Sequence, residues 1–279
     1  MLDKHQIQHF HQQGFLVLPE LFHSQQLESL KAAAQEVIAD FNIDHHKTIF
    51  TTKDNDRGRD QYFMDSAQRV HCFLEAEALD EDGNLLKPKH LCINKIGHAM
   101  HDLIPAFREF CSQPVFGNIL RDIGYQQPIL KQTMYIFKQP GIGEEVCWHQ
   151  DATYLIDSPS RIIGLWVALE DATPENGCLW VQPEGHQTPL RRRFEVDHET
   201  GHGEHTTLNE MTWPTLEQAQ AVPVKAGSLV LFDGHMPHFS SSNRSACSRQ
   251  AFTMHVTEQH STWSVNNWLQ RPTLGDFLL

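Results

Sequence analysis

The chain has 279 residues, of which 40% are hydrophobic and 20% charged, so it can bury a substantial core as a globular protein. Its net charge of −13 at pH 7 argues against a general binder of nucleic acid or of anionic membranes, because both require clustered positive charge. No apolar run approaches the length of a membrane span, and the polar start MLDKHQIQHFHQQGF lacks the apolar stretch of a signal peptide. The six cysteines are scattered without a Cys-x-x-Cys pair, which favours free thiols and a cytoplasmic location.

The first part of the chain, about residues 1–125, is predicted to be mainly helical. A helical spacing of apolar residues ends at Gly14, the apolar run Phe15–Leu18 predicts a short strand, and a second helix is expected to begin near His23 or Ser24. Residues 91–125 are expected to form further helices. Their stripe consists of Ile96, Met100, Leu103, Phe107 and Phe110, followed by a short helix over 115–123.

A polar, charge-mixed segment over residues 43–90 separates these helical regions. It contains a candidate strand over 69–75 and a turn signal over 81–84. An insertion of this length could form a lid or a loop on the substrate side of a site.

After Pro128 the pattern changes to short β-type runs, separated by turns that contain glycine and proline. The expected strands are 129–137, 147–155, 162–169, 178–181, 228–232 and 249–256. Several short strands at modest spacing predict an α+β, mainly β chain with a jelly-roll core and flanking N-terminal helices. We expect one domain over 1–279, with the core over about 126–260 and a C-terminal tail over 261–279.

The segment Trp148-His149-Gln150-Asp151 is the first candidate for a metal site. A histidine and a carboxylate two residues apart on an extended segment project from the same face and can bind one cation together. About one His-x-Asp is expected by chance in a chain with this many histidines and aspartates. The pair alone is therefore not evidence of a metal site, and a third ligand is needed. Two histidines and one carboxylate on one face of an iron ion are typical of non-haem Fe(II) oxygenases.

Two histidines on a later segment, His235 and His238, could supply that third ligand. Gly234 and Pro237 interrupt the strand alternation, so the residues alone leave the choice open, with His235 more simply explained as a loop residue. Arg249 follows His238 by eleven residues, at the start of a predicted strand. Its guanidinium offers a bidentate partner for the distal carboxylate of a dicarboxylate cosubstrate.

Other histidines and arginines have simpler explanations. His186, His198, His202 and His205 are expected in a solvated polar loop, because no strand pattern supports them. The run over 191–193 is expected to be a solvated charge run, or alternatively a contact for a phosphate-bearing substrate such as an acyl-CoA.

The order His149-x-Asp151, His238, Arg249 resembles the phytanoyl-CoA dioxygenase family of Fe(II)/2-oxoglutarate oxygenases. The resemblance covers almost the whole chain, and it rests on the motifs GFLVLPELF, NKIGHAMH, MYIFKQP, HQDATYL, GLWVALEDATPENGCLW, SRQAFTMH and NNWLQ. It implies a double-stranded β-helix core, with His149, Asp151 and His238 as iron ligands. It also implies that Arg249, helped by Ser240, holds the distal carboxylate of 2-oxoglutarate. The remaining residues implied to line the cosubstrate pocket are Lys95, Met134, Gln150 and Trp166.

The resemblance implies a dioxygenase that converts 2-oxoglutarate and O2 to succinate and CO2, coupled to hydroxylation of a small organic substrate that the sequence does not identify. Lys95 fits such a pocket for an independent reason, since a second cation near a dianion strengthens its binding. The alternative is a cupin-like protein that binds metal and 2-oxoglutarate without catalysis. A zinc hydrolase is disfavoured because it gives Arg249 no role. The expected partner is a small molecule, with neither nucleic acid nor membrane.

Overall fold

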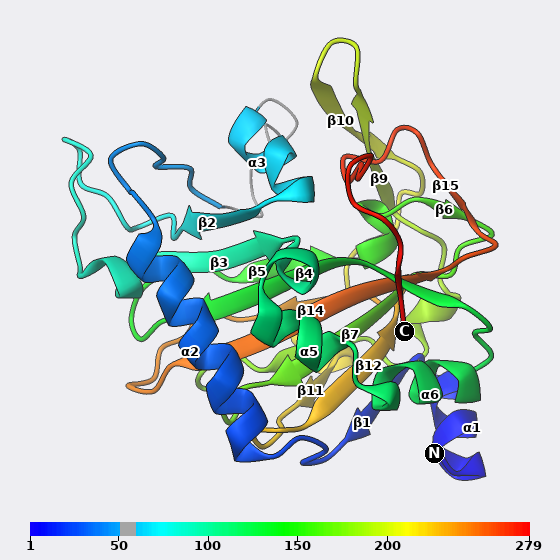
Figure 1. Cartoon of the computed structure of the whole chain (residues 1–279). Helices are drawn as coiled ribbons and strands as arrows, with labels where there is room; N and C mark the ends of the chain where they lie inside the picture. Colours follow the sequence, from blue (N-terminus) through cyan, green and yellow to red (C-terminus); the bar gives the residue numbers. More distant parts are fainter. Residues whose placement is uncertain (51–59) are drawn as a thin grey trace.

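The computed structural model describes residues 1–50 and 60–279, and two antiparallel sheets dominate it (Figure 1). The larger sheet has eight strands in the order β1-β12-β7-β14-β4-β3-β2, with β16 added beside β4. Its strands are β1 (Phe15–Leu18), β2 (Val70–Leu74), β3 (Ile93–His98), β4 (Pro128–Lys138), β7 (Ile163–Ala168), β12 (Leu229–Asp233), β14 (Arg249–Glu258) and β16 (Phe277–Leu278).

The smaller sheet faces it and has the order β11-β8-β13-β5. Its strands are short: β5 (Val146–His149), β8 (Leu179–Val181), β11 (Gln220–Val222) and β13 (His238–Ser240). An apolar cluster with members from both sheets, including Trp166, Val181, Phe232 and Ala251, packs one against the other. The predicted jelly-roll architecture is therefore confirmed.

The helices lie mainly over one face of the larger sheet, where α2, α5 and α6 cross in front of the strands in Figure 1. Their apolar sides join the strands in the largest core cluster. The first helix begins at the N-cap Asp3, whose carboxylate accepts a hydrogen bond from the Gln6 backbone at 2.8 Å, and it ends at Gly14, where φ is +80°. The helices are α1 (Lys4–Gln13), α2 (Ser24–Asp40), α3 (Gln61–Asp65), α4 (Met100–Leu103), α5 (Pro105–Cys111) and α6 (Pro114–Asp122).

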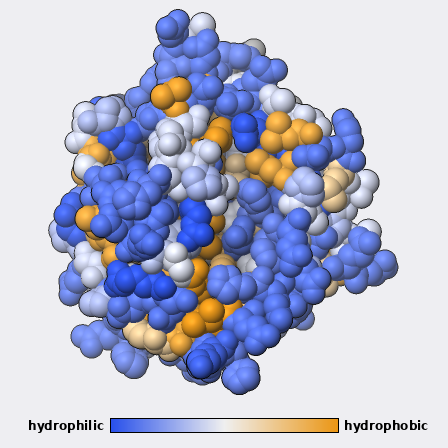
Figure 2. Space-filling view, turned by 90° about the vertical axis from the view of Figure 1, so that its right-hand side faces the viewer, coloured by the Kyte–Doolittle hydropathy of each residue, from blue (hydrophilic) through white to orange (hydrophobic). Residues whose placement is uncertain are grey.

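Short 3-10 turns and two small sheets complete the structure. The turns are η2 (Ser66–Gln68), η3 (Lys89–Leu91), η4 (Asp151–Thr153), η5 (Gly185–Gln187) and η6 (Leu216–Gln218). The hairpin β9 (Arg192–Asp197) and β10 (His202–Thr207) projects from the body of the protein (Figure 1), and β6 (Asp157–Ser158) pairs with β15 (Thr262–Trp263). The face seen in Figure 2 is mostly hydrophilic, with hydrophobic residues in smaller areas between the polar ones. None of the described helices is long and apolar enough to cross a membrane.

Three elements and the exposure of one residue differ from the sequence-based expectation. Residues 93–98 form a strand and not part of a helix, because β3 is paired with β2 on one side and β4 on the other, and this pairing outweighs the helical spacing of Ile96 and Met100. Leu103, expected on the buried stripe, is 49% exposed. The expected strand over 147–155 ends at His149 and continues into the turn η4. The hairpin β9–β10 holds His202 and His205, for which a polar loop was expected.

The segment between the first helices and the sheet is mostly irregular, as expected. The predicted strand near 69–75 is present as β2, and the predicted turn at 81–84 is closed by a hydrogen bond from the Gly83 backbone to the Asp80 carbonyl at 3.0 Å. The hypothesis of a lid over 43–90 falls partly on residues 51–59, which lie outside the described residues.

Candidate metal centre and cosubstrate pocket

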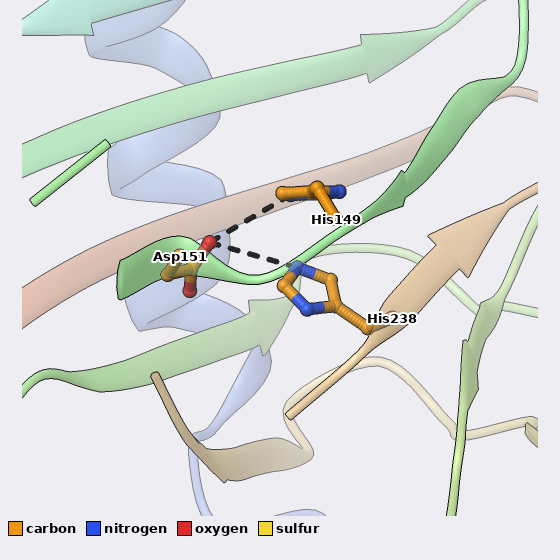
Figure 3. A group of neighbouring side chains, drawn as sticks. All are labelled: His149, Asp151 and His238. Atoms are coloured by element: carbon orange, nitrogen blue, oxygen red, sulfur yellow. Dashed lines mark ion pairs between the residues drawn. The ribbon is translucent and has the colours of Figure 1, made fainter. Parts of the chain in front are cut away.

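Three side chains converge at one end of the smaller sheet (Figure 3). His149 is the last residue of β5, and His238 is the first residue of β13, directly opposite it in the antiparallel register. Asp151 lies two residues beyond His149, at the start of η4. Each Nε2 atom of the two histidines lies 3.7 Å from the same oxygen, Oδ1 of Asp151. The three donor atoms lie within 4.8 Å of one another, which is the spacing of ligands around one metal ion.

The backbone orients both histidine rings toward this point. Nδ1 of His149 lies 2.9 Å from the Cys147 carbonyl, and Nδ1 of His238 lies 3.0 Å from the Met236 carbonyl. A carbonyl oxygen only accepts hydrogen bonds, so each Nδ1 carries the proton, and in the neutral ring the lone pair is at Nε2. This is the tautomer that a metal-binding histidine needs.

Asp151 is kept ionised despite its burial. It is 7% exposed, and burial alone would raise the pKa of its carboxyl group. The nearby His255 and His238 outweigh that effect and hold the pKa well below its ordinary value. A buried carboxylate between imidazole nitrogens is a suitable donor for a divalent cation.

His238, and not His235, joins this group. His235 contributes its backbone instead, because its carbonyl accepts a hydrogen bond of 2.8 Å from Nε2 of Gln150. The β13–β5 pairing places His238 opposite His149, so the group of three neighbouring side chains contains His238 and not His235.

The cavity beside the three side chains has a volume of about 500 Å³ and contains Arg249 in its wall. Arg249 begins β14, is only 1% exposed, and its Nε and Nη1 atoms have no hydrogen-bond partner among the described residues. Burial lowers the pKa of Arg249 to about 10, so the guanidinium remains charged at neutral pH. A buried cation with unsatisfied donors in a cavity wall fits a ligand carboxylate.

Four further residues predicted for the cosubstrate pocket line the same cavity: Lys95, Met134, Trp166 and Ser240. The Trp166 ring lies 5.5 Å from the Arg249 guanidinium carbon and stacks against the cation. Nζ of Lys95 lies 3.6 Å from Sδ of Met134. Lys95 therefore brings a second positive charge into the cavity, as its predicted role requires.

Gln150 departs from the expectation that it lines the pocket. Its side chain is fully buried among backbone groups: Oε1 accepts a hydrogen bond from the Arg191 backbone at 3.0 Å, while Nε2 donates to the His235 carbonyl. These bonds hold the segments around His235 and Arg191 against the end of β5. The family resemblance implied that Gln150 lines the pocket, but alternation along the extended chain turns its side chain to the opposite side.

The outer part of the cavity is formed by elements that the sequence left without a role. His205, expected to be solvated, lies on β10, packs 4.8 Å from the Phe194 ring and lines the cavity, as do Arg192, Tyr154 and Trp268. Of the other three histidines in that group, His198 and His202 are exposed and His186 is half-buried.

Arg191, expected in a solvated run, is 3% exposed. Its guanidinium lies 4.7 Å from the centre of the Trp213 ring, and burial lowers its pKa. The expectation failed because long side chains can pack their charged groups on aromatic faces, and a local charge pattern does not reveal this.

Sequence reasoning also missed His255 and Gln132. His255 lies on β14, with its Nε2 3.0 Å from Oδ2 of Asp151, and its Nδ1 is 2.9 Å from Nε2 of Gln132 on β4. Parity along β14 was the available signal, because positions 249, 253 and 255 share the face of the strand that lines the cavity.

The family model described as phytanoyl-CoA dioxygenase (PhyH) matches residues 10–251, most of the chain. The chain belongs to the phytanoyl-CoA dioxygenase family. It is 40% identical to phytanoyl-CoA dioxygenase domain-containing protein 1 homolog of Caenorhabditis briggsae over 271 residues, covering 94% of each chain. It is 38% identical to phytanoyl-CoA dioxygenase domain-containing protein 1 of Mus musculus, covering 96% of this chain and 95% of the relative.

The fold of this family member is also similar to that of solved structures described as non-heme and alpha ketoglutarate dependent. The epimerase SnoN in complex with Fe3+, alpha ketoglutarate and nogalamycin RO aligns with a TM-score of 0.66 at 14% identity, covering 99% of this chain and 92% of that one. At this identity the similarity establishes the fold alone. The phytanoyl-CoA dioxygenase resemblance seen in the sequence motifs is confirmed.

Proposed function

We propose that this protein is an Fe(II)- and 2-oxoglutarate-dependent dioxygenase, with His149, Asp151 and His238 as its iron ligands. The observation that carries the proposal is the convergence of both Nε2 atoms on Oδ1 of Asp151, with each ring turned by a backbone carbonyl. Two histidines and one carboxylate leave coordination positions open for a cosubstrate and for oxygen. Among solved structures of similar fold, SnoN is described in complex with Fe3+ and alpha ketoglutarate, and EvdO2 in complex with 2-oxoglutarate.

The 2-oxoglutarate site would extend from the metal to Arg249. The donors of Arg249 that lack protein partners suit a carboxylate at the far end of the cosubstrate, and Ser240 and Lys95 add a hydroxyl and a second cation to the same wall. Met134 and Trp166 provide apolar surface against the cosubstrate carbon chain. Gln150 is not part of this site, because its side chain bonds to backbone groups outside the cavity.

Iron with 2-oxoglutarate and O2 would supply the hydroxylation of a substrate C–H bond, with one oxygen atom going to the product and one to succinate, and with release of CO2. The chain's own residues bind and orient the reactants. The substrate would enter the outer part of the cavity, between Tyr154, His205 and Trp268, and we propose a small organic molecule on the basis of the cavity's size.

The test is succinate production from 2-oxoglutarate by purified protein with Fe(II), alone and with candidate metabolites. We expect turnover in the wild type, and its loss in the variants His149→Ala and Asp151→Ala. Binding of 2-oxoglutarate without any succinate, under all conditions tried, would instead identify a non-catalytic metal- and 2-oxoglutarate-binding protein. Full turnover in the His149→Ala variant would refute the assignment of the metal site.

A further inference from the structure

The two oxygens of Asp151 have different surroundings. Oδ1 faces the Nε2 atoms of His149 and His238, each at 3.7 Å, whereas Oδ2 lies 3.0 Å from Nε2 of His255. His255 does not belong to the three-residue metal group, and it comes from β14 in the larger sheet. The carboxylate therefore bridges the two sheets, with one oxygen directed to each.

The state of the His255 ring follows from its second nitrogen. Nδ1 lies 2.9 Å from Nε2 of Gln132, which is an amide nitrogen and can only donate. Nδ1 is then an acceptor, so the proton of a neutral His255 is on Nε2 and is donated to Oδ2 of Asp151. His255 and Gln132 are 4% and 5% exposed, and they lie opposite each other in the β14–β4 register, so water competes little for these bonds.

A glycine makes room for this arrangement. Gly164 on β7 is the register partner of His255, and a Cβ at this position would lie 3.0 Å from Oδ2 of Asp151 and 2.4 Å from the Phe232 ring. A side chain here would overlap the Phe232 ring and press against Oδ2 of Asp151. The position of Oδ2 is thus defined by the Nε2 donor of His255 on β14 and by the absence of a side chain at Gly164 on β7.

We propose that His255 is a positioning residue: it holds Oδ2 of Asp151 in a hydrogen bond, so that only Oδ1 is left to coordinate the metal. Gln132 supports it by fixing the ring tautomer. This inference rests on the proposed function, and it adds a hydrogen-bonded chain from Gln132 through His255 to Asp151. A carboxylate held in this way binds through one oxygen, which preserves an open coordination position that a two-oxygen mode would occupy.

Binding of Co(II) in place of iron tests the proposal without requiring turnover. Loss of a hydrogen bond that orients a metal ligand typically weakens metal binding by about 10- to 100-fold. We expect that loss in the His255→Leu variant, together with a changed visible ligand-field spectrum, because Oδ2 becomes free to coordinate. The His255→Gln variant keeps an N–H donor at a similar reach, and it should restore both affinity and spectrum to within a few-fold of the wild type.

A matched control comes from the same strand. Thr257 donates a hydrogen bond of 2.6 Å to Oδ2 of another buried carboxylate, Asp157, which is not in the metal group. The Thr257→Val variant should lower the midpoint of thermal unfolding of the metal-free protein and leave Co(II) affinity unchanged. This separates a general loss of stability from a specific effect on the metal.

The outcomes distinguish failure of the proposed metal site from failure of the positioning role of His255. If the wild type fails to bind Co(II) or Fe(II), the proposed function fails. If the wild type binds and His255→Leu binds equally well with an unchanged spectrum, only the positioning role of His255 is refuted. Should His255→Leu not fold, Gln132→Leu takes its place: weaker Co(II) binding supports the proposal, and wild-type affinity with a wild-type spectrum overturns it.

Discussion

His149 and His238 are register partners across the β5–β13 pair, with ring centroids 4.1 Å apart. Strand pairing, and not sequence proximity, therefore brings the second histidine to the His-x-Asp pair. The pairing also explains why His238 is selected over His235, which lies in the turn before β13 and contributes its carbonyl to Gln150. This difference leads to a direct test of the ligand set.

The variants His238→Ala and His235→Ala should behave differently in metal binding. His238→Ala removes one of three ligands and should reduce Fe(II) or Co(II) affinity by at least about 100-fold, since an ion with two protein ligands is held weakly. His235→Ala keeps the backbone carbonyl that accepts the Gln150 bond, so its affinity should stay within a few-fold of the wild type. Titration calorimetry measures both, and the reverse pattern would show that His235 is the ligand.

Replacement of Arg249 is expected to have opposite effects on thermal stability and on 2-oxoglutarate affinity. Its charge is buried with two unpartnered donor atoms, which costs free energy in the absence of a ligand. The Arg249→Met variant should therefore unfold at an equal or higher temperature than the ligand-free wild type. It should also lose 2-oxoglutarate affinity by at least about 10-fold, because the distal carboxylate has no partner.

An exposed arginine five residues earlier, Arg244, provides the control. Arg244→Ala should change neither 2-oxoglutarate affinity nor the thermal midpoint by a measurable amount. Thermal unfolding with and without 2-oxoglutarate and Fe(II) measures both the stability of each variant and its stabilisation by the cosubstrate. Unaltered 2-oxoglutarate affinity in Arg249→Met would remove Arg249 from the cosubstrate site.

The sequence predicted most accurately those elements whose pattern is local. The β-type run over 129–137 corresponds to β4 at Pro128–Lys138, and the run over 249–256 corresponds to β14 at Arg249–Glu258, because aromatic and branched residues recur along both strands. The prediction of a helix over residues 93–98 was wrong. The spacing of their apolar residues suits a helix as well as a strand, and only the pairing of β3 with β2 and β4 decides between the two.

The candidate site shows the same division. His149 and Asp151 were predicted as a ligand pair from a spacing that chance alone could supply, and His238, Arg249 and the family motifs gave the pair its significance. His255 and Gln132 were not predicted, because parity along the strand is a weak signal and a buried histidine on a strand is ordinary until its partner is known. Their contact with Asp151 depends on the β14–β4 register and on Gly164 in β7, which a single sequence does not specify.

Glu75 gives the protein a pH dependence of stability that can be tested without any ligand. It is 2% exposed, and burial raises the pKa of its carboxyl group from 4.5 to about 7, although Asn94 donates a hydrogen bond of 2.7 Å to it. Between these two values the folded state holds the proton more tightly than the unfolded state. The free energy of unfolding should therefore fall as pH rises from about 4.5 to 7, by at most about 3 kcal/mol from this group.

The Glu75→Gln variant should flatten this decline, because the neutral amide does not titrate. Lys138 acts in a different range: burial lowers its pKa from 10.5 to about 7, so its contribution rises above pH 7 and changes little below it. Denaturant unfolding of metal-free protein at several pH values measures the slope. An equal slope from pH 4.5 to 7 in wild type and Glu75→Gln would assign the dependence to other groups.

Arg271 is expected to anchor the C-terminal segment to the larger sheet. Its guanidinium pairs with the Asp102 carboxylate and donates hydrogen bonds to the carbonyls of Leu130 and Lys131 at 3.1 and 2.9 Å. Arg271→Leu leaves Asp102 buried without its cation, which should cost about 3–5 kcal/mol of stability. Because the same segment carries Trp268 into the cavity wall, the change should also reach the proposed substrate region.

A more solvent-exposed ion pair, Lys131 on β4 with Asp276 at 3.0 Å, is the comparison for Arg271, since the Asp276 side chain is 53% exposed. Lys131→Ala should cost about 1 kcal/mol or less, because water screens a pair with one exposed partner. Hydrogen exchange should show faster exchange over residues 262–278 in Arg271→Leu and little change there in Lys131→Ala, with denaturant unfolding giving the free energies. If the double variant Asp102→Leu/Arg271→Leu recovers most of the stability while exchange over 262–278 stays fast, then the cost of the single variant comes from the stranded carboxylate, and the anchoring comes from the bonds of Arg271 to the β4 carbonyls.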